Sequence, residues 1–98
     1  MITGKQRAQL RAMANGLDTI AQVGKGGMSD ALIKQTDEAL TAREIIKLRV
    51  LENSGVTAKE AAIELAEQTD SEVVQVIGTR FVLYRKNPKD TKIKLIKE

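Results

Sequence analysis

The stretch AQVGKGGMSDALIKQ, residues 21–35, decides the fold because an apolar run passes through a glycine loop into a helical pattern. Gly24, Gly26 and Gly27 carry no side chain, so the main chain can turn sharply there and approach another molecule closely. Ser29 is a favoured N-cap residue, which places the start of a helix directly after the loop. The stretch therefore predicts a strand, a glycine loop and a helix in succession.

Segments on either side show the periods of further helices and strands. The predicted helices span about 4–14, from Ser29 to about Leu40, and from Thr57 to about Gln68. The predicted strands span 19–23, the segment 41–50, and two stretches within 71–86 that are joined by Gly78 and Thr79. Glycine at the first central position of that turn suits a two-residue type II′ hairpin.

The segment TAREIIKLRV, residues 41–50, is ambiguous because Thr41 and Glu44 have the spacing of a helical capping box. Its apolar residues, however, alternate with Lys47 and Arg49. A helix would scatter such a period of two around its surface, whereas a strand places alternate residues on opposite faces. We therefore predict a strand here.

The predicted order is αβαβαββ, an α+β fold in one domain with a small four-stranded mixed sheet and helices packed on it. The 98 residues are enough for one modest core and too few for a second domain. Right-handed crossovers would place the second and third helices on the same face of the sheet. The segment 87–98 is a basic tail, for which a solvated terminus and a role in binding both remain open.

Composition excludes several classes of protein. The chain has no cysteine and no histidine, so it lacks thiolate nucleophiles, disulfides, the usual neutral-pH base and the commonest metal ligand. No apolar stretch approaches the ~20 residues that span a bilayer, and the first residues lack the apolar core of a secretory leader. We expect a cytoplasmic, monomeric, non-enzymatic protein with no metal, no cofactor and no membrane contact.

Charge is segregated along the chain, although the net charge is only +3. Residues 1–27 carry four bases and one acid, residues 28–79 carry five bases and ten acids, and residues 80–98 carry seven bases and two acids. If the fold brings the two ends together, they form one positive face suited to a polyanion.

Three chemistries fit a strand, glycine loop and helix. A nucleotide P-loop needs Ser or Thr after Gly-Lys, whereas Lys25 is followed by Gly26. A dinucleotide fingerprint needs a third glycine where this chain has Ser29, and 98 residues cannot build both halves of that fold. The remaining option is a nucleic-acid phosphate held by backbone amides, the helix dipole and Lys25. The alternative is structural, in which the glycines only supply positive φ in a tight turn.

Four motifs, in order over about residues 3–86, resemble the CRM domain family, the stand-alone YhbY-like RNA-binding proteins of bacteria. They are TGKQRAQLRAMA at 3–14, IAQVGKGGMSDALI at 20–33, REIIKLRVL at 43–51 and EVVQVIGTRFVLYR at 72–85. The resemblance implies a fold related to the C-terminal domain of bacterial translation initiation factor three. It also implies a G-x-x-G loop that contacts RNA, here Gly24, Lys25, Gly26 and Gly27, and ribosomal RNA in precursors of the large subunit as the partner.

Further candidate RNA contacts lie outside the G-x-x-G loop. They are Ser29, Arg7, Arg11, Arg80, Arg85 and Lys86. The plain alternative for each arginine or lysine is a solvated surface charge. The only aromatic residues are Phe81 and Tyr84, too few for a base-stacking platform, so we expect recognition of phosphates, 2′-hydroxyls and RNA shape. An alternative function is a protein–protein adaptor that docks through the sheet face or the acidic third helix.

Overall fold

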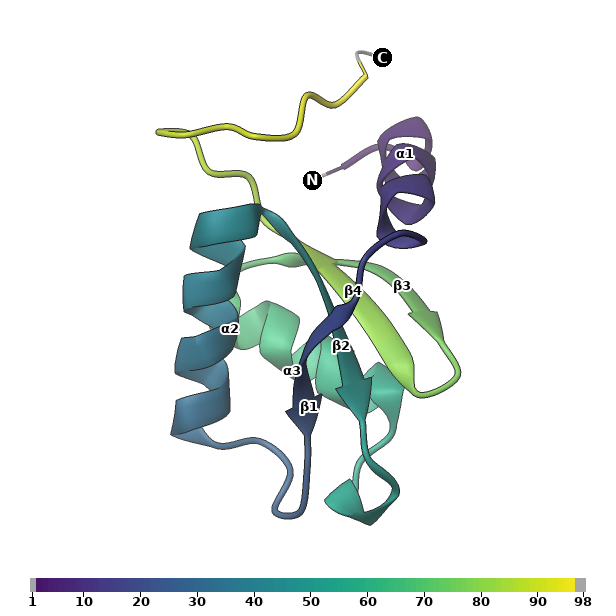
Figure 1. Cartoon of the computed structure of the whole chain (residues 1–98), viewed down its shortest axis with the longest axis vertical. Coiled ribbons are helices and arrows are strands. Elements are labelled where there is room, and N and C mark those ends of the chain that lie inside the picture. The colour runs from purple at the N-terminus through teal and green to yellow at the C-terminus, as the bar shows by residue number, and fades with distance from the viewer. Residues whose placement is uncertain (1, 97–98) are drawn as a thin grey trace.

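The computed structural model describes residues 2–96, which form one layer of sheet with helices on both sides (Figure 1). The elements, in order, are α1 (Gly4–Ala14), β1 (Thr19–Val23), α2 (Asp30–Arg43), β2 (Ile45–Val50), the 3-10 turn η1 (Glu52–Ser54), α3 (Ala58–Thr69), β3 (Glu72–Ile77) and β4 (Arg80–Tyr84). The predicted order αβαβαββ is confirmed. No helix within this range is long and apolar enough to cross a bilayer.

The sheet is mixed, as predicted, with the strand order β1-β2-β4-β3. β1 and β2 are parallel, whereas β4 is antiparallel to both β2 and β3. Gly78 in the β3–β4 turn has a φ of 59°, and Thr79 has no positive φ, which agrees with the predicted type II′ hairpin. The C-terminal ends of β1 and β2 and the N-terminal end of β4 therefore meet at one edge of the fold.

Side-chain caps fix where the helices begin. Thr3 and Gln6 form a complete capping box on α1, and Thr57 and Glu60 form another on α3. The Ser29 hydroxyl accepts a hydrogen bond from the Leu32 N–H at 3.1 Å and so caps α2. Each cap satisfies amides that the helix itself leaves without partners.

The C-terminal end of α2 differs from the prediction. The helix continues past Leu40 to Arg43, and β2 begins only two residues later at Ile45. Between them Glu44 has a φ of 65°, a left-handed conformation that a non-glycine residue seldom adopts. Sequence patterns mark such stops by glycine, so this one was not visible.

Each face of the sheet carries its own core. α2 and α3 pack on one face, as predicted, through residues such as Leu40 and Leu65. α1 packs on the other face, where Leu10 and Ala14 share a buried cluster with Val82. Since β4 contributes to both cores, its residues from Phe81 to Tyr84 are all buried.

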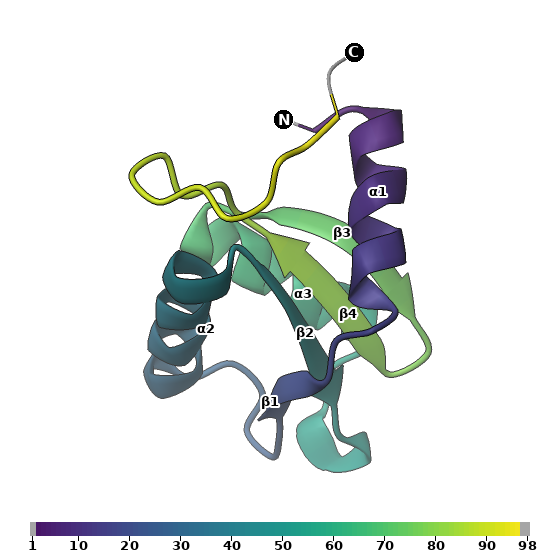
Figure 2. The same cartoon turned by 45° about the horizontal axis from the view of Figure 1, so that its top comes forward.

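The tail lies on the face of the sheet that α1 covers. It passes over the end of the sheet and runs beside α1 (Figure 2). Gln6 donates to the carbonyl of Ile96 and Gln9 to that of Lys94, both at 2.9 Å. Ile93 is buried in the α1 core. The N-terminal helix and the basic tail are therefore brought together in the fold.

Candidate nucleic-acid interface

The G-x-x-G loop is a tight turn at the C-terminal end of β1. The Gly27 N–H donates to the carbonyl of Gly24 at 3.0 Å, which closes a four-residue turn. Gly26, at the third position, has a φ of 95°, as a type II turn requires. Lys25 occupies the exposed tip. The positive φ at Gly26 gives the loop a structural need for glycine, in line with the structural alternative.

The loop also packs against the segment that follows β2. Gly27 has a φ of 65°, and a Cβ there would lie 3.7 Å from the carbonyl oxygen of Ser54. A Cβ on Gly24 would meet the side chain of Leu51 at 3.8 Å. Within residues 2–96, the N–H groups of Lys25 and Gly26 have no hydrogen-bond acceptor. The turn is thus held by its own contacts while two amides at its tip remain available.

The first turn of α2 contains a capping hydroxyl and a carboxylate, both of which bear on whether it could hold an anion. The Ser29 hydroxyl already accepts the hydrogen bond from the Leu32 N–H that caps α2. Asp30 lies in the same first turn, where its negative charge offsets part of the positive end of the helix dipole. The start of α2 is therefore a weaker source of positive potential than its helix dipole alone would make it.

A basic sheet face, consisting of Lys47, Arg49 and Arg80, lies beside the loop. Residues directly opposite each other on neighbouring strands lie on the same side of the sheet. Arg49 is opposite Arg80, and Lys47 is opposite Val82, so these four side chains lie on one side. Val82 belongs to the α1 core, so the three cations occupy the part of that face beyond α1. None of them makes an ion pair or hydrogen bond within the described residues.

Sequence reasoning missed Lys47 and Arg49 as candidate contacts. The signal was present, because their alternation with apolar residues predicted the strand and so placed both on one face. Glu52 also borders the hollow between Arg49 and Arg80, but it forms no ion pair with a described residue. The basic sheet face therefore keeps its positive charge.

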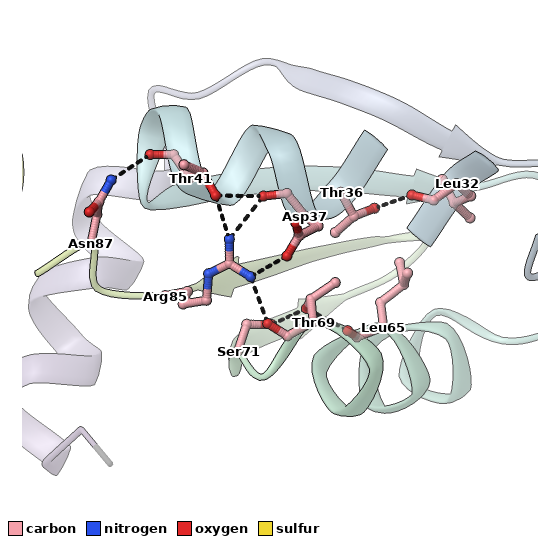
Figure 3. Close-up of polar contacts among 9 residues, drawn as sticks. All are labelled: Leu32, Thr36, Asp37, Thr41, Leu65, Thr69, Ser71, Arg85 and Asn87. Atoms are coloured by element: carbon pink, nitrogen blue, oxygen red, sulfur yellow. Dashed lines mark hydrogen bonds and ion pairs between the residues drawn. The ribbon is translucent and has the colours of Figure 1, made fainter. Parts of the chain in front are cut away.

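Arg85 is bound within the protein, where it links α2 to the end of α3, and is not a free surface cation. Its guanidinium lies between α2 and α3 and donates to the Asp37 carboxylate at 2.6 Å and to the Thr69 carbonyl at 2.7 Å (Figure 3). It also donates to the Asp37 carbonyl and the Thr41 hydroxyl, at 2.9 and 2.8 Å. These four bonds engage both terminal amino groups of the guanidinium.

The other predicted cations lie away from the loop. Arg7 donates to the carbonyls of Val73 and Val74 and so covers the edge strand β3. Arg11 is exposed on α1, and Lys86 follows the C-terminal end of β4, opposite the end where Arg80 lies. The structure therefore gathers Lys25 and Arg80 at one end and leaves the remaining predicted cations elsewhere.

Acidic residues collect on the opposite side of the molecule. α3 carries three exposed carboxylates, Glu60, Glu64 and Glu67. It packs on the side of the sheet opposite the basic sheet face. The Thr57 backbone N–H donates to Glu60 and lowers the pKa of that carboxyl group. Within the described chain no group of three or more acidic side chains could hold a metal ion.

Known proteins resemble this chain over nearly its whole length. "Probable RNA-binding protein YqeI" of Bacillus subtilis is 45% identical over 95 residues, which cover 97% of this chain and 99% of that one. "Probable RNA-binding protein PA4753" of Pseudomonas aeruginosa is 29% identical over 93% of this chain and 88% of that one. The solution structure of SAV1595 from Staphylococcus aureus matches 98% of this chain and 100% of its own, with a TM-score of 0.82 and 47% identity. Since the model of the CRS1 / YhbY (CRM) domain also matches residues 2–85, the chain belongs to the CRM domain family.

Proposed function

We propose that this protein is a non-enzymatic RNA-binding protein. It contacts phosphates of structured ribosomal RNA through the G-x-x-G loop and the basic sheet face, and it acts in assembly of the large ribosomal subunit. Two relatives bear names that describe them as probable RNA-binding proteins, which supports RNA as the partner. The choice of ribosomal RNA rests on the family resemblance of the four sequence motifs.

The observation that carries the proposal is the pairing of Arg49 with Arg80 across β2 and β4. Like charges directly opposite each other destabilise a sheet, and no described carboxylate forms an ion pair with either. An RNA phosphate between them would relieve the repulsion through charge-assisted, bidentate hydrogen bonds. Lys25 and the free loop amides follow β1, the strand next to β2. One RNA backbone can therefore contact the loop and the Arg49–Arg80 pair together.

The mode of recognition follows from the aromatic residues. Phe81 is fully buried and Tyr84 is 3% exposed, and they are the only two aromatic residues in the chain. No ring is therefore available for base stacking, which proteins use to read single strands. The protein is expected to bind the phosphates and 2′-hydroxyls of folded RNA with weak sequence preference.

Crosslinking in cells, followed by sequencing of the attached RNA, tests the proposal. We expect reads to concentrate on the large-subunit ribosomal RNA and on its precursors. A pull-down with and without nuclease tests the adaptor alternative, because an RNA-dependent association is lost after digestion whereas a protein–protein contact persists. Reads spread evenly over cellular RNA would refute the ribosomal assignment.

A further inference from the structure

A second concave site lies at the other end of β1, away from the G-x-x-G loop. This tail-side groove has a volume of about 530 Å³, within the range of about 300–1,000 Å³ that small ligands occupy. It is bounded by the α1–β1 connection, the last turn of α2, the start of β2 and the tail. The side chains that matter here are Leu17, Asp18, Ile20, Arg43, Lys47 and Lys92.

The chemistry of the tail-side groove combines positive charge with apolar surface. Three of its side chains are cationic and one, Asp18, is a carboxylate, which leaves an excess of positive charge. Arg43 and Lys47 make no ion pair or hydrogen bond within residues 2–96. Among the described residues the Lys92 ammonium group pairs only with the exposed carboxylate of Asp90, at 2.6 Å, and such a surface pair is weak enough to exchange for a phosphate.

The tail forms one wall of the groove, and Glu44 holds it in place. Its carboxylate is fully buried and accepts hydrogen bonds from the backbone N–H groups of Asn87, Lys92 and Ile93, at 2.7, 2.5 and 2.7 Å. The left-handed backbone of Glu44 also ends α2 directly after Arg43. One residue therefore fixes both the tail that carries Lys92 and the helix end that carries Arg43.

We infer that the tail-side groove binds an unpaired nucleotide of the bound RNA. The phosphate lies among Arg43, Lys47 and Lys92, and the ribose or base lies against Leu17 and Ile20. Asp18 accepts a hydrogen bond from a 2′-hydroxyl or a base amino group. The inference rests on the proposed RNA binding.

Lys47 is the reason to assign RNA, rather than a free nucleotide, as the source of this phosphate. It lines the tail-side groove and also, with Arg80, a hollow on the basic sheet face, so the two positive surfaces meet at Lys47. A backbone that follows the basic sheet face would pass over Lys47 and enter the groove. Aliphatic side chains on the floor can cover a ribose or base without the stacking rings that the chain lacks.

The test compares an RNA hairpin carrying a one-nucleotide bulge with the same hairpin fully paired, using the full chain. The variants are Arg43→Gln and Lys92→Gln, and Lys5→Gln is the control because Lys5 is exposed on α1 and lines neither site. We expect the wild type to prefer the bulged RNA by about two- to fivefold, as loss of one partly exposed phosphate contact implies. Each groove variant should lose that preference, and the control should keep it.

Equal binding of both RNAs by the wild type, or an unchanged preference in both groove variants, overturns the inference but leaves the proposed function intact. Failure of the wild type to bind either RNA refutes the proposed function itself. AMP is added as a free competitor, and we expect no competition at micromolar concentration. Tight AMP binding that Arg43→Gln abolishes, without a preference for the bulge, would make the groove a free-nucleotide site and also overturn the inference.

Discussion

Arg49 of β2 lies directly opposite Arg80 of β4, on the part of the sheet that α1 leaves uncovered. We expect Arg49→Ala to weaken RNA binding while the free energy of unfolding stays constant or rises by about 0.2–1 kcal/mol, because a like-charge pair is removed. Urea denaturation and fluorescence anisotropy with a ribosomal RNA fragment measure the two quantities. Lys5→Ala is the matched control. A clear loss of stability would show that Arg49 has a structural partner.

Lys25 at the tip of the G-x-x-G loop is expected to act through charge alone. With about four to six phosphates neutralised, log K should fall with log salt with a slope of order −3 to −5. Lys25→Glu should weaken binding, flatten the slope by about 1, and change the free energy of unfolding by less than about 0.5 kcal/mol. Binding titrations at several salt concentrations give both numbers. An unchanged affinity in the folded variant would show that the loop is only a structural turn and that Lys25 does not contact RNA.

Arg85 should behave in the opposite way. Arg85→Ala removes the guanidinium that joins Asp37, Thr41 and Thr69, and it leaves their oxygen atoms without this donor. We expect a loss of about 2–3 kcal/mol in the free energy of unfolding, since hydrogen bonds of charged groups are worth more than neutral ones. The affinity of the folded fraction for RNA should remain close to that of the wild type. A large loss of affinity at full stability would make Arg85 an RNA contact instead.

Glu44 is expected to control the position of the tail. Glu44→Gln replaces one carboxylate oxygen by a donor, which cannot accept from the amides that the oxygen served. We expect about 1.5–3 kcal/mol of lost stability and faster hydrogen exchange at Lys92 and Ile93. Exchange at β4, which is buried between the two cores, provides the internal reference. Unchanged protection of the tail amides would mean that contacts with α1 suffice to hold it.

Tyr84 predicts a dependence of stability on alkaline pH. Burial, and secondarily the charge of Glu44, raise the pKa of Tyr84 above its ordinary value of 10. Its folded state therefore favours the neutral phenol, and the stability that this contributes is complete below about pH 10 and declines as the pH rises toward the folded-state pKa. Above about pH 10, the free energy of unfolding of Tyr84→Phe should fall less steeply with pH than that of the wild type. Parallel curves for the two proteins would contradict this.

The fold was predictable because its signals are local. Capping boxes at Thr3 and Thr57 mark where helices begin, and the alternation of residues 46–50 identifies a strand. The end of α2 was not predictable, because Glu44 adopts its left-handed backbone only with hydrogen bonds from residues more than forty positions later. Local patterns carry no information on such a contact.

The candidate site was predictable in part. The loop and Arg80 lie together at one end, and Lys47 and Arg49 follow from the strand pattern once the faces are assigned. The engagement of Arg7 with β3, and of Arg85 with α2 and α3, depends on tertiary contacts. A basic residue in a list of motifs cannot show whether its charge faces solvent or a carbonyl group.

The burial of β4 between two cores has a practical consequence for spectroscopy. The chain contains a single tyrosine and no tryptophan, so nearly all intrinsic ultraviolet emission arises from Tyr84. Tyr84 belongs to the same buried cluster as Ile93 of the tail and Leu10 of α1. Its emission intensity and anisotropy should therefore serve as an unlabelled optical probe of whether the tail around Ile93 is seated, in the free protein and during RNA titrations.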